Sequence, residues 1–122
     1  MGADCEVVGI GVSPGVGRGE LHVDVDAALD ALDAGRHVVL ALDMSSPADV
    51  VAMTRAAAII AVRGNLHSHT AIVANAAGVP AVVGLMDMVI GATGVEIDGV
   101  AVPVGTAMMV DGALGVVRWD AP

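Results

Sequence analysis

Aliphatic runs alternate along this chain with segments of helical periodicity. Residues 37–44 (HVVLALDM) and 57–63 (AAIIAVR) are almost continuously apolar, which is the pattern of strands buried on both faces. A third apolar segment, residues 80–85 (PAVVGL), follows the same pattern. Because predicted helices separate these segments, we expect parallel strands joined by right-handed crossovers.

Three segments carry the periodicity or the end signals of short helices. In residues 24–36 the apolar side chains recur on one helical face, and Gly35 supplies a stop. Ser46 followed by Pro47 is typical of an N-cap and a first helical residue. A third helix is expected over residues 69–77, directly after a loop that contains two histidines.

The two ends of the chain are rich in glycine and valine. Residues 7–23 (VVGIGVSPGVGRGELHV) are two apolar stretches around a Ser-Pro-Gly turn, which predicts a strand pair. Residues 86–119 predict strands and loops, with a last hairpin turning at Asp111-Gly112. The whole pattern predicts one α/β domain over residues 1–122, with a central, mostly parallel sheet or barrel flanked by short helices and by N- and C-terminal β-hairpins.

Composition narrows the function classes. The chain is 56% hydrophobic with Trp119 as its one aromatic residue, so it has no aromatic platform for stacking bases or sugars. No apolar run approaches the roughly 20 residues of a membrane span, and no secretion signal is evident, so a cytoplasmic protein is expected. A net charge of −9 disfavours nucleic acid as a partner. Cys5 is the one cysteine and cannot form an internal disulfide.

The candidate chemistry lies in the loop before the third predicted helix. His67 and His69 stand at the mouth of this helix, where the first amide groups and the helix dipole stabilise an anion. A neutral imidazole is a nitrogen nucleophile that can accept and pass on a phosphoryl group. From the spacing alone, a histidine that merely caps or hydrogen-bonds the loop is the simpler interpretation.

Two other interpretations of the histidines remain open. His67 and His69, one residue apart, could hold a metal ion, although no third and fourth ligand are evident nearby. His22 and His37 fall in or beside predicted strands and are expected to be ordinary, partly exposed residues.

The segment GNLHSHTAIVANAAGVPAVVG resembles the active-site signature of a known family, the phosphohistidine swivelling (mobile) domain of phosphoenolpyruvate-utilising enzymes. That signature runs Gly-Gly-x-Thr-Ser-His-x-small-aliphatic-aliphatic-Ala-Arg, then Gly-aliphatic-Pro-small-Val-Val-Gly. Pyruvate phosphate dikinase, phosphoenolpyruvate synthase, enzyme I of the sugar phosphotransferase system and rifampin phosphotransferase carry it. The stretch GVSPGVGRGELHV and the strand and helix before the signature are similar to the family as well.

The resemblance implies roles for individual residues. His69 would be the phosphorylated histidine, because it follows Ser68 and precedes the small and aliphatic run. Ser68 would be the serine of the motif and Gly64 its first glycine, while Thr70 would help to support the phosphate-binding loop. The implied fold is a swivelling β/β/α domain.

Three positions depart from the family pattern. His67 stands in place of the threonine and could modulate the site by a hydrogen bond or a positive charge. Asn65 stands in place of the second glycine, and asparagine tolerates a left-handed backbone, so the loop geometry is expected to be retained. Asn75 stands where an arginine is common, which removes a guanidinium near the site.

The resemblance implies a phosphocarrier that moves a phosphoryl group on His69 between the active sites of partner domains. Those partners would be an ATP-grasp nucleotide-binding domain and a phosphoenolpyruvate- or acceptor-binding domain, in cis or in trans. They would hold Mg²⁺ and ATP or phosphoenolpyruvate, with no cofactor on this chain alone. Two alternatives are a non-catalytic regulatory or interaction module that keeps the fold and, third, a His-x-His metal-binding domain.

Overall fold

The computed structural model describes residues 4–120 and confirms the α/β class. Within this part of the chain there are eleven strands, three α-helices and one 3₁₀ helix. The strands are β1 Asp4–Val8, β2 Ile10–Ser13, β3 Val16–His22, β4 Val38–Leu42, β5 Ala58–Ala61, β6 Ala81–Val83, β7 Met88–Gly91, β8 Gly94–Ile97, β9 Val100–Pro103, β10 Ala107–Asp111 and β11 Val116–Asp120. The helices are α1 Val25–Asp33, η1 Pro47–Asp49, α2 Val50–Arg55 and α3 His69–Ala77.

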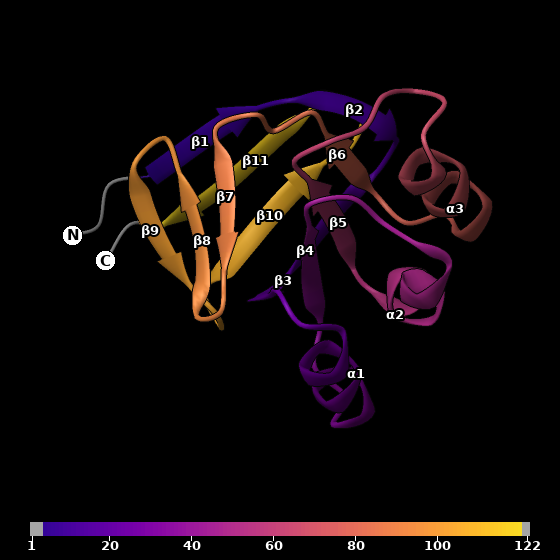
Figure 1. The fold of residues 1–122 in the computed structure, drawn as a ribbon, viewed down its shortest axis with the longest axis horizontal. Coiled ribbons are helices and arrows are strands. Elements are labelled where there is room, and N and C mark those ends of the chain that lie inside the picture. Colours follow the sequence, from indigo (N-terminus) through magenta and orange to yellow (C-terminus); the bar gives the residue numbers. More distant parts are fainter. Residues whose placement is uncertain (1–3, 121–122) are drawn as a thin grey trace.

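Eight strands form one sheet in the order β1-β11-β10-β3-β4-β5-β6-β2. The pairings β4–β5 and β5–β6 are parallel, as the sequence pattern predicts. The pairing β3–β4 is parallel as well, whereas the pairings on either side are antiparallel. The two edge strands, β1 and β2, are separated by Gly9 alone, so one bent segment brings both edges of the sheet together. Figure 1 shows β1 and β2 as this continuous segment, with the parallel strands opposite.

The N-terminal strand pair is a point where the prediction is wrong. β2 and β3 both form, but β2 pairs with β6, and β3 pairs with β10 and β4. The reason is a close crossing of backbones: a Cβ on Gly11 would overlap the carbonyl oxygen of Gly112, so the two glycines let the N-terminal segment pass against the β10–β11 loop. The predicted C-terminal hairpin is confirmed, although its loop spans residues 112–115.

The helices begin and end close to their predicted positions. The backbone N–H of Ser46 donates to Asp49 Oδ2 at 2.8 Å, which fixes the start of the η1–α2 segment. Ser68 caps α3, and Gly78 ends it with a left-handed φ of 71°. None of the helices within residues 4–120 has the length and apolar character to cross a membrane.

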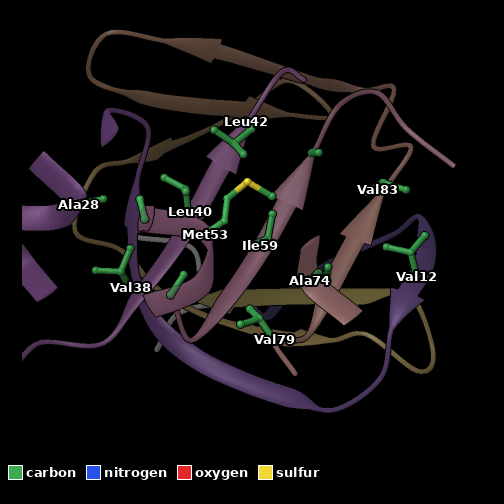
Figure 2. Packing of buried hydrophobic residues seen from close by; sticks show 14 of the residues in the cluster. Val12, Ala28, Val38, Leu40, Leu42, Met53, Ile59, Ala74, Val79 and Val83 are labelled. Atoms are coloured by element: carbon green, nitrogen blue, oxygen red, sulfur yellow. The ribbon is translucent and has the colours of Figure 1, made fainter. Parts of the chain in front are cut away.

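Two apolar clusters fill the two faces of the main sheet. One face packs against the helices, with Met53 of α2 lying over Leu40 of β4 and Ile59 of β5 (Figure 2). The other face packs against the small antiparallel sheet β7-β8-β9 and includes Trp119. Since every residue of β4 and β5 is buried, these two strands hold their connecting loops in fixed positions.

Two carboxylates meet beside the β8–β9 turn. Asp98 has a positive φ of 52°, and its backbone N–H donates to the carbonyl of Asp87 at 3.3 Å. Partial removal from water, together with a hydrogen bond to the Asp87 side chain and the charge of that side chain, raises the pKa of the Asp98 carboxyl above its ordinary 3.8.

The substitution Asp98→Asn should therefore stabilise the fold near neutral pH, because ionising this carboxyl costs more in the folded chain than in the unfolded chain. Asparagine also tolerates the positive φ. The gain should be present above the raised folded-state pKa and vanish as the pH falls below the ordinary value of 3.8. Urea denaturation at about pH 7 and about pH 3 measures it, and an equal gain at both pH values would contradict the electrostatic cause.

Candidate functional site

The site lies at the edge of the sheet where β4, β5 and β6 end. These strands are parallel neighbours, so the loops that follow them meet at one edge. A backbone hydrogen bond from Arg63 N to Asp43 O, at 2.9 Å, joins the loops after β5 and β4, and one from Leu85 N to Ala61 O, at 3.2 Å, joins the loop after β6 to the last residue of β5. The loop after β5 leads directly to His69, the first residue of α3.

The loop before His69 is built by glycine and asparagine. Gly64 has φ 142°, and a Cβ there would lie 3.1 Å from Ser68 Oγ and 3.2 Å from Val83 Cβ, so only glycine fits without strain. Asn65 Oδ1 accepts from His67 N at 2.8 Å, and the Asn65 carbonyl accepts from Ser68 Oγ at 2.8 Å. Because Asn65 has no positive φ, it supports the loop by these hydrogen bonds and not, as expected, by a left-handed backbone.

Ser68 and His69 stand at the start of a nine-residue helix. The Ser68 side chain accepts from Ala71 N at 3.4 Å, and the Ser68 carbonyl accepts from Ile72 N at 3.0 Å. His69 is therefore held at the positive end of the α3 dipole, as the sequence predicted.

A buried hydroxyl pair orients the His69 ring. Ser45 Oγ lies 3.0 Å from His69 Nδ1 and 2.6 Å from Thr70 Oγ1. Ser45 is 8% exposed and Thr70 is 2% exposed. Thr70 therefore contacts the site through Ser45, on its buried side. Sequence reasoning missed Ser45, whose signal was its place just after a buried parallel strand.

The hydrogen bond to Ser45 distinguishes the two ring nitrogens of His69. When Nδ1 carries the proton and donates to Ser45 Oγ, the lone pair of the neutral ring is on Nε2. Ser45 can then donate its own proton to Thr70 Oγ1. The arrangement can present Nε2 as a nucleophile at the head of a helix that favours anions.

His67 and Asn75, which replace the threonine and the arginine of the family pattern, have different surroundings. His67 is exposed, and its backbone N–H is held by Asn65. Asn75 Nδ2 donates to the carbonyls of Val12 at 2.6 Å and Ala71 at 2.8 Å, so its amide ties α3 to β2. The residue in place of the arginine therefore has a structural role in this chain.

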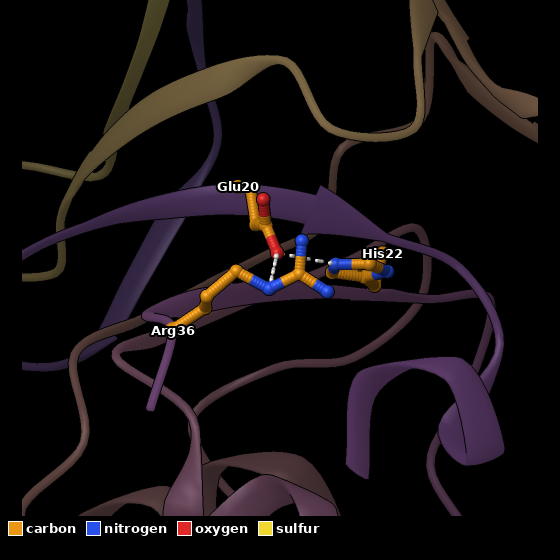
Figure 3. A network of polar contacts seen from close by, with 3 residues as sticks. All are labelled: Glu20, His22 and Arg36. Atoms are coloured by element: carbon orange, nitrogen blue, oxygen red, sulfur yellow. Dashed lines mark hydrogen bonds and ion pairs between the residues drawn. The ribbon is translucent and has the colours of Figure 1, made fainter. Parts of the chain in front are cut away.

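The remaining histidines lie outside the site. His37 is exposed, as expected, but His22 is 8% exposed and therefore buried, contrary to the prediction. His22 Nε2 lies 3.1 Å from Glu20 Oε1, which also pairs with Arg36 Nε at 3.3 Å (Figure 3). Within residues 4–120, no three His, Cys, Asp or Glu side chains gather in a way that could hold a metal ion.

Known proteins match both the sequence and the fold. Residues 34–115 match the family described as PEP-utilising enzyme, mobile domain. A probable phosphoenolpyruvate synthase of Pyrococcus abyssi is 46% identical over 84 residues, which cover 66% of this chain and 10% of that protein. A pyruvate, phosphate dikinase of Clostridium symbiosum is 33% identical over 114 residues, covering 90% of this chain and 13% of that protein.

One solved structure supports the fold alone. The NMR structure of a UPF0107 protein has a TM-score of 0.54 and 16% identity, and the likeness covers 93% of this chain and 97% of that one.

Fold and sequence together define an α/β domain with a histidine at the head of its third α-helix. The chain belongs to the family of PEP-utilising enzyme mobile domains. It spans 10% and 13% of the length of these two curated relatives.

Proposed function

We propose that this chain is a phosphocarrier that accepts a phosphoryl group on Nε2 of His69 and delivers it to a second site. The observation that carries the proposal is the hydrogen bond between His69 Nδ1 and Ser45 Oγ, at 3.0 Å, at the N-terminus of α3. It engages one ring nitrogen and leaves the other to react. The family membership supports the same role.

The chemical step is a displacement at phosphorus. The Nε2 lone pair forms the N–P bond while the bond from phosphorus to the donor oxygen breaks, and the donor leaves with that electron pair. The ring gains a positive charge, which the Nδ1–H shares through its hydrogen bond to Ser45. Attack by an acceptor oxygen then breaks the N–P bond and restores the neutral imidazole.

Partner domains complete the proposed reaction. A compact chain of this size has a radius of gyration of about 14 Å, too small to house separate donor and acceptor sites. We place ATP or phosphoenolpyruvate, with Mg²⁺, on an ATP-grasp domain and on a phosphoenolpyruvate- or acceptor-binding domain, in cis or in trans. The resemblance implies these domains, and the full-length relatives, of which the matched segment is 10% and 13%, are large enough to contain them.

Chemical phosphorylation with phosphoramidate tests the carrier without any partner. His69 should be labelled faster than the exposed His37, with an acid-labile, base-stable phosphate that ³¹P and ¹⁵N NMR place on Nε2. Ser45→Ala should slow the labelling of His69 about tenfold, because one hydrogen bond to a charged ring is lost. Phosphate on Nδ1, or labelling of His69 no faster than of His37, would contradict the proposal.

A non-catalytic interaction module is the second candidate. The observation in its favour is Asn75, whose amide joins α3 to β2 at a position where the family pattern has an arginine. Such a module would bind its partner without carrying phosphate, so partner binding with no phosphate on His69 in the presence of phosphoenolpyruvate or ATP would favour it.

A further inference from the structure

A groove of about 460 Å³ lies on the outer surface of the strands β3, β10 and β11. Side chains alternate between the two faces of a strand. Met108 and Trp119 belong to the apolar cluster under the small antiparallel sheet, so Met109 and Arg118 point to the opposite, outer face. The α-helices pack over β4, β5 and β6 (Figure 1), and Arg18 and Arg118 on the outer surface are exposed.

Two arginines flank Met109 on this surface. Met109 pairs with Arg18 of β3 on one side and with Arg118 of β11 on the other. Neighbouring strands are about 4.8 Å apart, so the backbones of the two arginines are about 10 Å apart and their long side chains can reach one group between them. Because the chain has only five basic residues and a net charge of −9, two arginines in one groove are a local concentration of positive charge.

The two arginines are ready to donate hydrogen bonds. The other arginines of residues 4–120 each pair with a carboxylate, whereas Arg18 has no such ion pair. Arg118 donates from Nε to Glu6 Oε2 at 2.6 Å, which orients its guanidinium and leaves the terminal amino groups to donate elsewhere. Guanidinium groups of this kind bind carboxylate and phosphate oxygens through paired hydrogen bonds.

The groove also has an acidic end. Asp120 lines it two residues after Arg118, so both side chains lie on the same face of β11. Because the Asp120 carboxylate repels an anion, the anionic group of a ligand belongs at the arginines. Met109 and Ala107 line the groove as well and offer an apolar surface to the rest of the ligand.

The groove lies at the opposite end of the parallel strands from His69. His37, which lines the groove, directly precedes β4, whereas His69 begins the helix that follows β5. Parallel strands start at one edge of a sheet and end at the other. An anion in the groove is therefore held apart from the imidazole that we propose as the phosphoryl carrier.

We infer that this groove binds a small organic anion, with a carboxylate or phosphate group between Arg18 and Arg118 and an apolar remainder on Met109. A volume of about 460 Å³ lies within the range of small-molecule sites. The inference does not depend on the phosphocarrier proposal, because none of the residues that line the groove belongs to the loop before His69.

NMR titration of the ¹⁵N-labelled chain with n-butyl phosphate, hexanoate and inorganic phosphate tests the site. We expect at least one of the two organic anions to bind with a Kd of about 1 mM or tighter, and to shift the backbone amides of Arg18, Met109 and Arg118. Inorganic phosphate should bind about tenfold more weakly, because it has no apolar part to place on Met109. The tighter organic anion tells whether the groove prefers phosphate or carboxylate.

Arg18→Gln should weaken this binding at least about tenfold, because a charge-assisted hydrogen bond is lost. Arg63→Gln is the matched control, since it removes the same charge from the loop after β5, where Arg63 pairs with Asp43. Its Kd should stay within about twofold of the wild-type value, because screening by salt weakens distant charges. Both arginines are exposed, so both variants should fold.

Three results would overturn the inference. The first is shifts confined to the loop before His69, or no saturation by any of the anions at about 20 mM. The second is equal weakening by Arg18→Gln and Arg63→Gln, which would show a general effect of charge. The third is a dimer of this chain that Arg18→Gln disrupts, because the groove would then be an interface between two copies.

Discussion

His69→Ala should lower phosphate incorporation from phosphoenolpyruvate and a partner enzyme by at least about a thousandfold, because the nucleophile itself is removed. Within residues 4–120, His69 is the histidine whose ring combines a hydroxyl partner on Nδ1 with a place at a helix N-terminus. Rapid-quench labelling followed by phosphopeptide mapping measures the loss, and circular dichroism checks that the variant is folded.

His67→Ala is the matched control, since it removes the neighbouring imidazole. His67 is exposed and is held by its backbone, so this variant should keep phosphate on His69 and change the rate by less than about tenfold. The interpretation would be wrong if His67→Ala abolished labelling while His69→Ala retained it. His67→Thr, which restores the residue of the family pattern, should behave like the wild type or better.

Local sequence signals predicted the parts of the site that depend on neighbours in the chain. A fully buried strand within residues 37–44, β4 Val38–Leu42, is confirmed, as are the start of α3 at His69 and the closing Gly78. Each of these features is decided by a short-range rule: continuous apolarity, an N-cap serine or a left-handed glycine. The parallel order of three strands followed from the same local pattern and placed His69 at the sheet edge.

Features that depend on distant contacts were not predictable from the same signals. Ser45 is 24 residues from His69 in the chain and reaches it because β4 and β5 are neighbours. His22 is buried and lies against Glu20, which pairs with Arg36 from beyond α1, and no local pattern shows this arrangement. The pairing of β2 with β6 likewise depends on a distant contact, the close approach of Gly11 to Gly112.

That close approach also gives the largest expected loss of stability. Gly112→Ala should destabilise the fold by about 3 kcal/mol or more, because overpacking against rigid backbone cannot be relieved by a rotamer change. A Cβ at this position would overlap the carbonyl oxygen of Ser13 and lie 2.9 Å from Ala81 N. Ser13 and Ala81 are paired residues of β2 and β6, so the strain would fall on the pairing that holds β2 in place.

Gly91→Ala is the control for Gly112→Ala. Gly91 also lies at a strand end, has no positive φ, and a Cβ there would find its nearest neighbour, Gly94 O, at 3.7 Å. Urea denaturation should show a lower midpoint for Gly112→Ala with an unchanged slope. For Gly91→Ala the free energy of unfolding should stay within about 0.5 kcal/mol of the wild-type value. Equal midpoints for the two variants would mean that the close approach of the β10–β11 loop to β2 does not hold the sheet together.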